Sequence, residues 1–149
     1  MTKSNWSPPR SPIPLIQELF FPDEWKILVS CVMLNCTSRK QIEKVIWNFF
    51  GRWPTPEALL SADINEVKMM IKPLGFSERR TNNLLRLADE YLHTQWIHAS
   101  ELHGIGVYAA RAWEIFCQGI IGTEAPKDHA LTYYYELFKD HEAFKSDSR

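Results

Sequence analysis

The chain of 149 residues contains only six glycines and only three cysteines, Cys31, Cys36 and Cys117. An odd number of cysteines without paired short spacing argues against a disulfide framework and against a four-cysteine metal or iron–sulfur site. We therefore expect a reducing, intracellular setting and no metal-binding residues. No run of about 18 apolar residues is present, so a membrane-spanning helix is not expected. The first 14 residues also lack the apolar core of a signal peptide.

The chain likewise lacks an excess of charge of either sign. Lys and Arg together number 17, Asp and Glu number 18, and the formal net charge is −1. The charge of the whole molecule therefore does not indicate a nucleic-acid partner, and any such function must rest on local features. Apolar residues are abundant, with 45% hydrophobic and 13% aromatic residues. A chain of this length and composition is expected to bury an ordinary core as one domain.

No segment shows the alternation of a strand, and helical spacing dominates, so we expect an all-α fold. Residues 1–14, rich in Pro and Ser, are expected to form an extended lead-in, residues 15–141 the single domain and residues 142–149 a C-terminal tail. Trp25, Trp47 and Trp113 are expected in the core. Helices are expected over residues 15–20, from a cap at Asp23, and from a cap at Ser38 to Phe50, where Gly51 is expected to stop the helix. Further helices are expected after Pro56, from a cap at Asp63 to near Pro73, from Ser77 to His93, over 107–119 and from Asp128 to Phe138.

Two of the six glycines stand one residue apart in the stretch LHGIGVY, residues 102–108. Glycine costs about 1 kcal/mol inside a helix, so the pair is expected to serve a turn before the next helix. In that turn Gly104 and Gly106 would take positive φ and let another backbone approach. The free N–H groups at the helix start can then bind an anion such as a DNA phosphate. An ordinary corner with glycines for close packing is the alternative.

The stretch LHGIGVYAARA resembles the hairpin of helix–hairpin–helix DNA glycosylases, whose pattern is L-[PH]-G-[VI]-G-x-[KY]-x-A. Further blocks, among them LIQELFFPDEWKILVSCVMLN, IKPLGF, DEYL, IFC and DHALTYY, are similar to the thymine glycosylases of that family that carry a methyl-CpG-binding domain. The similarity extends from Trp6 to about His141. It implies a multi-helix fold with a DNA cleft between two helical subdomains. It also implies excision of thymine or uracil mispaired with guanine, in double-stranded DNA, by a nuclear monomer in base excision repair.

Asp128 takes the place of the family's catalytic aspartate. A glycosylase flips the nucleotide out of the stack, and a carboxylate beside the sugar stabilises the positive charge left by the departing base and can activate a water. The alternative role for Asp128 is the N-cap of the last helix. Tyr108 stands where family members that also cut the strand carry a lysine nucleophile. A phenol cannot form a Schiff base, so the resemblance implies hydrolysis without a lyase step.

The resemblance also implies a base pocket formed by Leu15, Ile16, Gln17 and Tyr108. The Gln17 amide carries both a donor and an acceptor, which suits the edge of thymine or uracil. For Gln17 the alternative is a solvent-facing side chain on a short helix, and for Tyr108 it is a core tyrosine.

Two tips are implied to enter the DNA. Phe76 takes the place of a leucine and would act as an apolar wedge, with a core contact at a helix end as the alternative. Cys36 takes the place of an arginine that fills the space left by the flipped base. Arg79 and Arg80, close to Phe76, are either phosphate contacts or ordinary exposed residues of a helix start.

The remaining implied DNA contacts are the hairpin residues His103, Gly104, Ile105, Gly106 and Val107, and Ala130 beside the catalytic aspartate. Val107 and Ala130 both replace lysines of the family, which lowers the expected affinity for phosphate. No cofactor and no iron–sulfur cluster is expected, although backbone carbonyls of such hairpins can hold a monovalent cation. Two other hypotheses compete with the enzyme: a catalytically weak module that recognises mismatched or bent DNA, and a helical protein-interaction domain with a coincidental glycine turn. Asp128 favours the enzyme, because a pure binding module has no need of that carboxylate.

Overall fold

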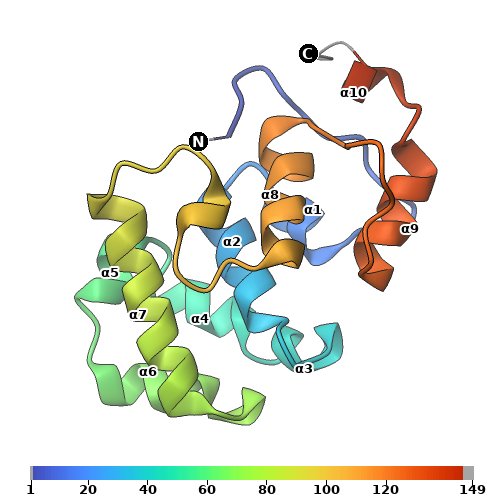
Figure 1. The fold of residues 1–149 in the computed structure, drawn as a ribbon. Helices are drawn as coiled ribbons and strands as arrows, with labels where there is room; N and C mark the ends of the chain where they lie inside the picture. Colours follow the sequence, from blue (N-terminus) through green and yellow to red (C-terminus); the bar gives the residue numbers. More distant parts are fainter. Residues whose placement is uncertain (1, 146–149) are drawn as a thin grey trace.

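The computed structural model describes residues 2–145, and all regular secondary structure in that range is helical, as expected. Figure 1 shows α2 between two groups of helices, with α4 to α7 on one side and α8 to α10 on the other. None of the described helices is long and apolar enough to cross a membrane. The α-helices are α1 (Ile16–Phe20), α2 (Glu24–Met33), α3 (Arg39–Glu43), α4 (Ile46–Arg52), α5 (Pro56–Leu60), α6 (Ile64–Ile71), α7 (Ser77–His93), α8 (Val107–Gln118), α9 (His129–Phe138) and α10 (Glu142–Lys145), and the 3₁₀ turns are η1 (Lys72–Leu74) and η2 (Ala99–Glu101).

Local capping determines where most helices begin. The side chains of Asp23, Ser38 and Asp63 each accept a hydrogen bond from a backbone N–H two or three residues further on. These bonds satisfy N–H groups that have no partner within the helix. The three expected caps are therefore confirmed, and α7 begins at Ser77 as expected.

The single helix expected from Ser38 to Phe50 is wrong, because the chain forms two helices there. The N–H groups of Lys44 and Val45 bond to carbonyls three residues back, at 3.3 and 2.9 Å, and this tighter turn separates α3 from α4. Gly51 does not stop the helix either, since it lies within α4. The helix ends at Arg52, because the next residue, Trp53, precedes a proline and is therefore disfavoured in helical conformation.

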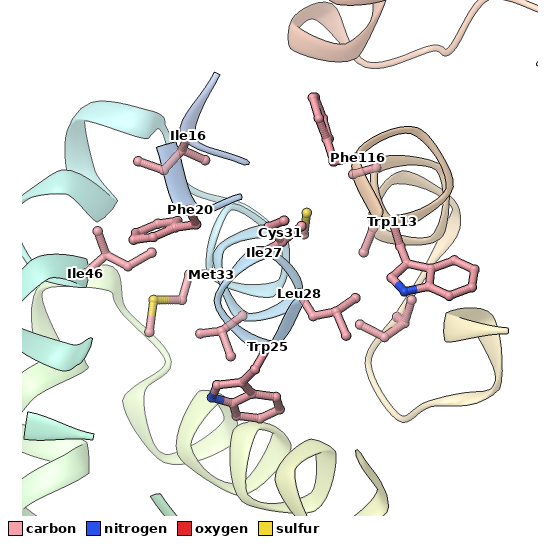
Figure 2. Packing of buried hydrophobic residues seen from close by; sticks show 14 of the residues in the cluster. Ile16, Phe20, Trp25, Ile27, Leu28, Cys31, Met33, Ile46, Trp113 and Phe116 are labelled. Carbon is pink, nitrogen blue, oxygen red and sulfur yellow. The ribbon is translucent and has the colours of Figure 1, made fainter. Parts of the chain in front are cut away.

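The core is centred on α2, which packs against α1 and α8 and also contacts Tyr91 of α7 and Phe50 of α4. Trp25 and Trp113 are buried as expected, but Trp47 is 49% exposed, so its expected place in the core is wrong. Its ring lies against Phe20 on the surface, with 5.0 Å between the ring centroids. Figure 2 looks along α2 and labels Ile16, Phe20, Trp25, Ile27, Leu28, Cys31, Met33, Ile46, Trp113 and Phe116.

A buried carboxylate joins three helices around this core. Glu24 of α2 accepts hydrogen bonds from Trp113 Nε1 of α8 at 2.7 Å and from Tyr91 Oη of α7 at 2.8 Å. Buried charge is tolerated where it is hydrogen-bonded in this way. The contact fixes α7 against α8, and the loop between those two helices is the glycine hairpin.

The N-terminal segment lies along α8. Lys3 N donates to the carbonyl of Cys117 at 2.7 Å, and Trp6 Nε1 donates to that of Phe116 at 2.8 Å. The Trp6 ring also contacts Phe144 of α10, with 5.1 Å between centroids. The expected C-terminal tail thus begins with a helix that touches the N-terminal segment, and residues 146–149 lie outside the described range.

Candidate active site

A cavity of about 620 Å³ lies where the starts of α1, α8 and α9 meet the loop between α2 and α3. These segments are far apart in sequence, so the fold brings their side chains together. Residues selected from the sequence that line the cavity are Leu15, Ile16, Gln17, Cys36, Tyr108, Asp128 and Ala130. Residues that sequence reasoning did not select are Leu34, Asn35, Thr37, Ser38, Arg39 and His129.

The start of α1 is held by the buried side chain of Glu18. Its carboxylate accepts hydrogen bonds from Leu15 N at 2.8 Å, Ser11 N at 2.8 Å and Ser11 Oγ at 2.5 Å. Arg39, from α3, donates to the carbonyl of Pro14. Hydrogen bonds that involve a charged group are stronger than bonds between neutral groups. The bonds made by Glu18 and Arg39 therefore fix the backbone that leads into the cavity wall at Leu15–Gln17.

Gln17 is wholly buried, and the solvent-facing alternative is therefore wrong. Its Nε2 donates to Tyr108 Oη at 2.5 Å and to Cys31 Sγ at 3.3 Å. Gln17 Oε1 is buried and has no hydrogen-bond partner among the described residues. The Gln17 amide thus has an unpaired acceptor, Oε1, while both hydrogen bonds of its nitrogen are made within the protein.

Burial keeps the neighbours of this amide uncharged. It raises the pKa of the Cys31 thiol to about 12, and it raises the pKa of Tyr108 well above the ordinary value of a phenol. Cys31 was not selected from the sequence as a site residue, because a cysteine within an apolar helix is indistinguishable from an ordinary core residue.

Asp128 takes the N-cap role that the sequence offered as the alternative, and it also lies at the cavity. Its Oδ2 accepts a hydrogen bond from Leu131 N at 3.1 Å as the N-cap of α9, and the half-buried side chain also lines the cavity. The preceding loop is anchored by Arg111 of α8, which donates to the carbonyls of Ile121, at 2.9 Å, and Glu124. The end of this loop is fixed by Thr132 of α9, whose Oγ1 donates to Pro126 O at 2.6 Å.

The glycine hairpin contains one left-handed residue rather than two. Gly104 has φ +81°, but Gly106 has φ −88°, so the expected positive φ at Gly106 is wrong. A Cβ at either position would meet no atom within 4 Å. Close packing within the chain therefore does not require these glycines. The open space leaves room for another molecule to approach the backbone at the start of α8.

The other hairpin residues differ in exposure. The Ile105 side chain is buried, whereas Val107 is 88% exposed. Two hydrogen bonds join His103 to α7. Its backbone N–H donates to Glu90 Oε1 at 2.7 Å, and its ring Nε2 lies 2.9 Å from Asn83 Oδ1. Tyr108 belongs to the cavity lining, and the five preceding residues of the hairpin do not.

Phe76 is 67% exposed at the start of α7, so the core-contact alternative is wrong. It has φ +50°, and the Arg79 guanidinium lies over its ring, 5.5 Å from the centroid. Cys36 is also exposed and has φ +61°. Among residues 2–145, no group of three or more His, Cys, Asp or Glu could hold a metal ion.

Comparison with known proteins places this arrangement among DNA repair proteins. The model of the HhH-GPD superfamily of base excision DNA repair proteins matches residues 29–133. The chain is similar to the methyl-CpG-binding domain protein 4-like protein of Arabidopsis thaliana, with 41% identity over 136 residues, 91% of this chain and 31% of that protein. It is 36% identical over 96 residues to a thymine-DNA glycosylase of Aeropyrum pernix, which covers 59% of this chain and 43% of that protein.

A solved structure supports the fold independently. The structure of a thermostable thymine-DNA glycosylase superposes with a TM-score of 0.64 at 22% identity, covering 70% of this chain and 51% of that one. The chain spans less than half the length of each of the two curated relatives above. A helical interaction domain with a coincidental glycine turn does not account for these matches.

Proposed function

The chain belongs to the HhH-GPD superfamily of base excision DNA repair proteins, and from this premise we propose that it is a monofunctional DNA glycosylase. Its substrate is thymine or uracil paired with guanine in double-stranded DNA, and it acts as a monomer in the nucleus. The observation that carries the proposal is the single cavity lined by the Asp128 carboxylate, the Gln17 amide and the Tyr108 phenol.

The Gln17 amide supports a preference for thymine and uracil over cytosine. The cavity of about 620 Å³ falls in the range of pockets that enclose small ligands, and a flipped pyrimidine nucleotide is of that size. Thymine and uracil carry a hydrogen on N3, whereas N3 of cytosine is an acceptor. Gln17 Oε1 is a buried acceptor without a partner in the described part of the chain. Leaving such a group unsatisfied costs about 1–3 kcal/mol, so a base that offers N3–H is favoured.

Asp128 would assist the departure of the base. The bond between the base nitrogen and the sugar C1′ breaks with its electron pair on the base, and the carboxylate stabilises the positive sugar. A water then adds to C1′ and gives its proton to the carboxylate. Tyr108 supplies no amine for a Schiff base, so the strand stays intact and the product is an abasic site.

Contacts to the DNA backbone would come from the hairpin. α8 is 12 residues long, and its N-cap Gly106 has no side chain to satisfy the first N–H groups. The positive end of the helix dipole and these N–H groups suit a phosphate. This contact needs no lysine at Val107.

A binding module without efficient catalysis is the second candidate. Val107, Cys36 and Ala130 are all exposed and uncharged where the resembling glycosylases carry cations. Without those cationic side chains, contacts to phosphate are weaker, and the space that a flipped base leaves in the duplex is filled less well.

The two candidates are separated by the parent protein and Asp128→Asn, incubated with duplexes that carry G·T, G·U or A·T pairs and then heated in alkali. Asparagine is as good an N-cap as aspartate, so a loss of activity reports the carboxylate rather than the fold. We expect alkali-labile sites at thymine and uracil opposite guanine, formed about 10²–10⁴-fold more slowly by the variant. Binding without cleavage of any duplex would favour the second candidate. Breaks without alkali, or a protein–DNA adduct trapped by borohydride, would contradict the monofunctional reaction.

A further inference from the structure

One guanidinium connects two surface segments that are far apart in sequence. Arg80, in the first turn of α7, donates from Nε to Gly75 O at 2.8 Å and from Nη2 to Asn35 O at 2.9 Å. Its Nη1 lies 3.5 Å from Met33 O. Arg80 therefore spans from the turn before α7 to the loop after α2, and each of its three nitrogens donates to a backbone carbonyl.

Two of the three carbonyls that Arg80 contacts belong to peptide groups that precede a residue with left-handed φ. Asn35 O belongs to the peptide that precedes Cys36, and Gly75 O to the peptide that precedes Phe76. Cys36 and Phe76 both adopt left-handed φ, at +61° and +50°. That conformation is unfavourable for residues with a Cβ and persists where the surroundings enforce it. The Arg80 fork holds both peptides from the same side chain.

Both held residues are exposed tips rather than parts of the core. Phe76 is 67% exposed, and Cys36 is exposed and lines the cavity. If the chain acts as a glycosylase, these are the two tips that reach into the duplex. Their separation would then decide whether one tip pushes into the stack while the other meets the vacated space.

We propose that Arg80 is a positioning residue that clamps the Phe76 turn to the Cys36 loop and so sets the geometry for nucleotide flipping. The inference rests on the proposed function. It predicts a selective defect, because a base that is already unpaired needs no flipping and still reaches Asp128. Arg80 does not line the cavity and has no part in the bond-breaking step.

The test compares Arg80→Ala and Arg80→Lys with Arg86→Ala, which removes the same charge from α7 where the arginine is exposed and paired with Glu90. Each protein is given uracil in a G·U duplex and uracil inside an unpaired bubble, under single-turnover conditions. Loss of hydrogen bonds to a charged group is expected to slow duplex excision about 10–100-fold in both Arg80 variants. Bubble excision should stay within about twofold of the parent rate, and Arg86→Ala should match the parent on both substrates. Fluorescence of 2-aminopurine placed beside the uracil should show reduced flipping in the Arg80 variants only.

Full duplex activity in Arg80→Lys would overturn the clamp, because an ammonium keeps the charge but cannot bridge both carbonyls. An equal loss on duplex and bubble would also overturn it, since that pattern reports general damage to the fold. If the parent protein excises neither substrate, the proposed function fails. The clamp is then judged by 2-aminopurine fluorescence in the bound mismatched duplex, where unchanged flipping in Arg80→Ala overturns it.

Discussion

The Gln17 amide nitrogen lies 2.5 Å from the Tyr108 phenol oxygen, although the two residues are 91 positions apart in the chain. This bond joins α1 to the first turn of α8 at the cavity wall. It also determines which end of the amide is left unpaired, because Nε2 donates to Tyr108 and Cys31 while Oε1 has no partner within residues 2–145. The pairing thus connects the hairpin helix to the group proposed to select the base.

Replacing Tyr108 with phenylalanine should weaken base selection with little effect on the fold. The phenol is half-buried, and losing one hydrogen bond typically costs about 0.5–1.5 kcal/mol. Without it the Gln17 amide is free to turn and present its nitrogen, so the preference for thymine over cytosine opposite guanine should fall. Urea denaturation and single-turnover excision of both bases measure the two effects. Tyr133→Phe is the matched control, since that phenol accepts a hydrogen bond from Ile13 N away from the cavity. Unchanged base preference in Tyr108→Phe would show that the amide orientation is set elsewhere.

Much of the fold followed from local signals, and the exceptions have physical causes. The caps at Asp23 and Asp63 are decided within a few residues, so the sequence predicts them well. The break between α3 and α4 has no such signal, because Lys44 and Val45 are acceptable helix residues. Trp47 could be placed on the surface only once α1 and α4 were packed.

In the site, too, local sequence patterns could be predicted and contacts between distant segments could not. Asp128 and the glycines stand in a recognisable pattern, whereas the Arg80 contacts go to backbone carbonyls, which leave no trace in side-chain identity. The place of Cys31 beside the site could not be predicted either, because only the folded chain brings its sulfur to 3.3 Å from Gln17 Nε2. Contacts between distant segments thus account for what the sequence did not reveal.

The two hairpin glycines should respond differently to alanine. Gly104 has φ +81°, so Gly104→Ala should destabilise the protein by about 1–2 kcal/mol. Gly106 has negative φ and open space around its Cβ position, so alanine fits there without strain, but glycine is the better N-cap. These two effects oppose each other, so Gly106→Ala should change the free energy of unfolding by less than about 1 kcal/mol. Its DNA affinity should nevertheless fall if a phosphate approaches the start of α8. Thermal melting and fluorescence anisotropy with a labelled mismatched duplex measure the two properties. Parent-like affinity in Gly106→Ala would mean that no DNA group approaches this backbone.

Alkylation should distinguish Cys36 from the other two thiols. Cys36 is exposed, whereas Cys31 and Cys117 are buried and burial raises the pKa of each to about 12, which leaves little reactive thiolate. Iodoacetamide should add one group to the native protein and three to the denatured protein, as counted by mass spectrometry. Because Cys36 lines the cavity, the adduct should obstruct nucleotide entry and slow excision. Cys36→Ser should resist this inactivation, and a labelled protein with full activity would place Cys36 outside the path of the flipped nucleotide.

The same buried thiols predict that the protein loses stability in alkali. For Cys31 and Cys117 the pKa is raised from an unfolded value of 9.0 to about 12 in the folded protein, first of all by burial. Between about pH 9 and 12 the unfolded chain has released these protons while the folded protein retains them. The unfolded state then binds fewer protons, so the free energy of unfolding falls as pH rises, by up to about 1.4 kcal/mol per pH unit for each thiol. Urea unfolding at several pH values from 8 to 11 measures the slope, and Cys31→Ala should flatten it by up to the share of one thiol. A free energy of unfolding that stays constant over this range would show that the thiols ionise in the folded protein as readily as in the unfolded chain.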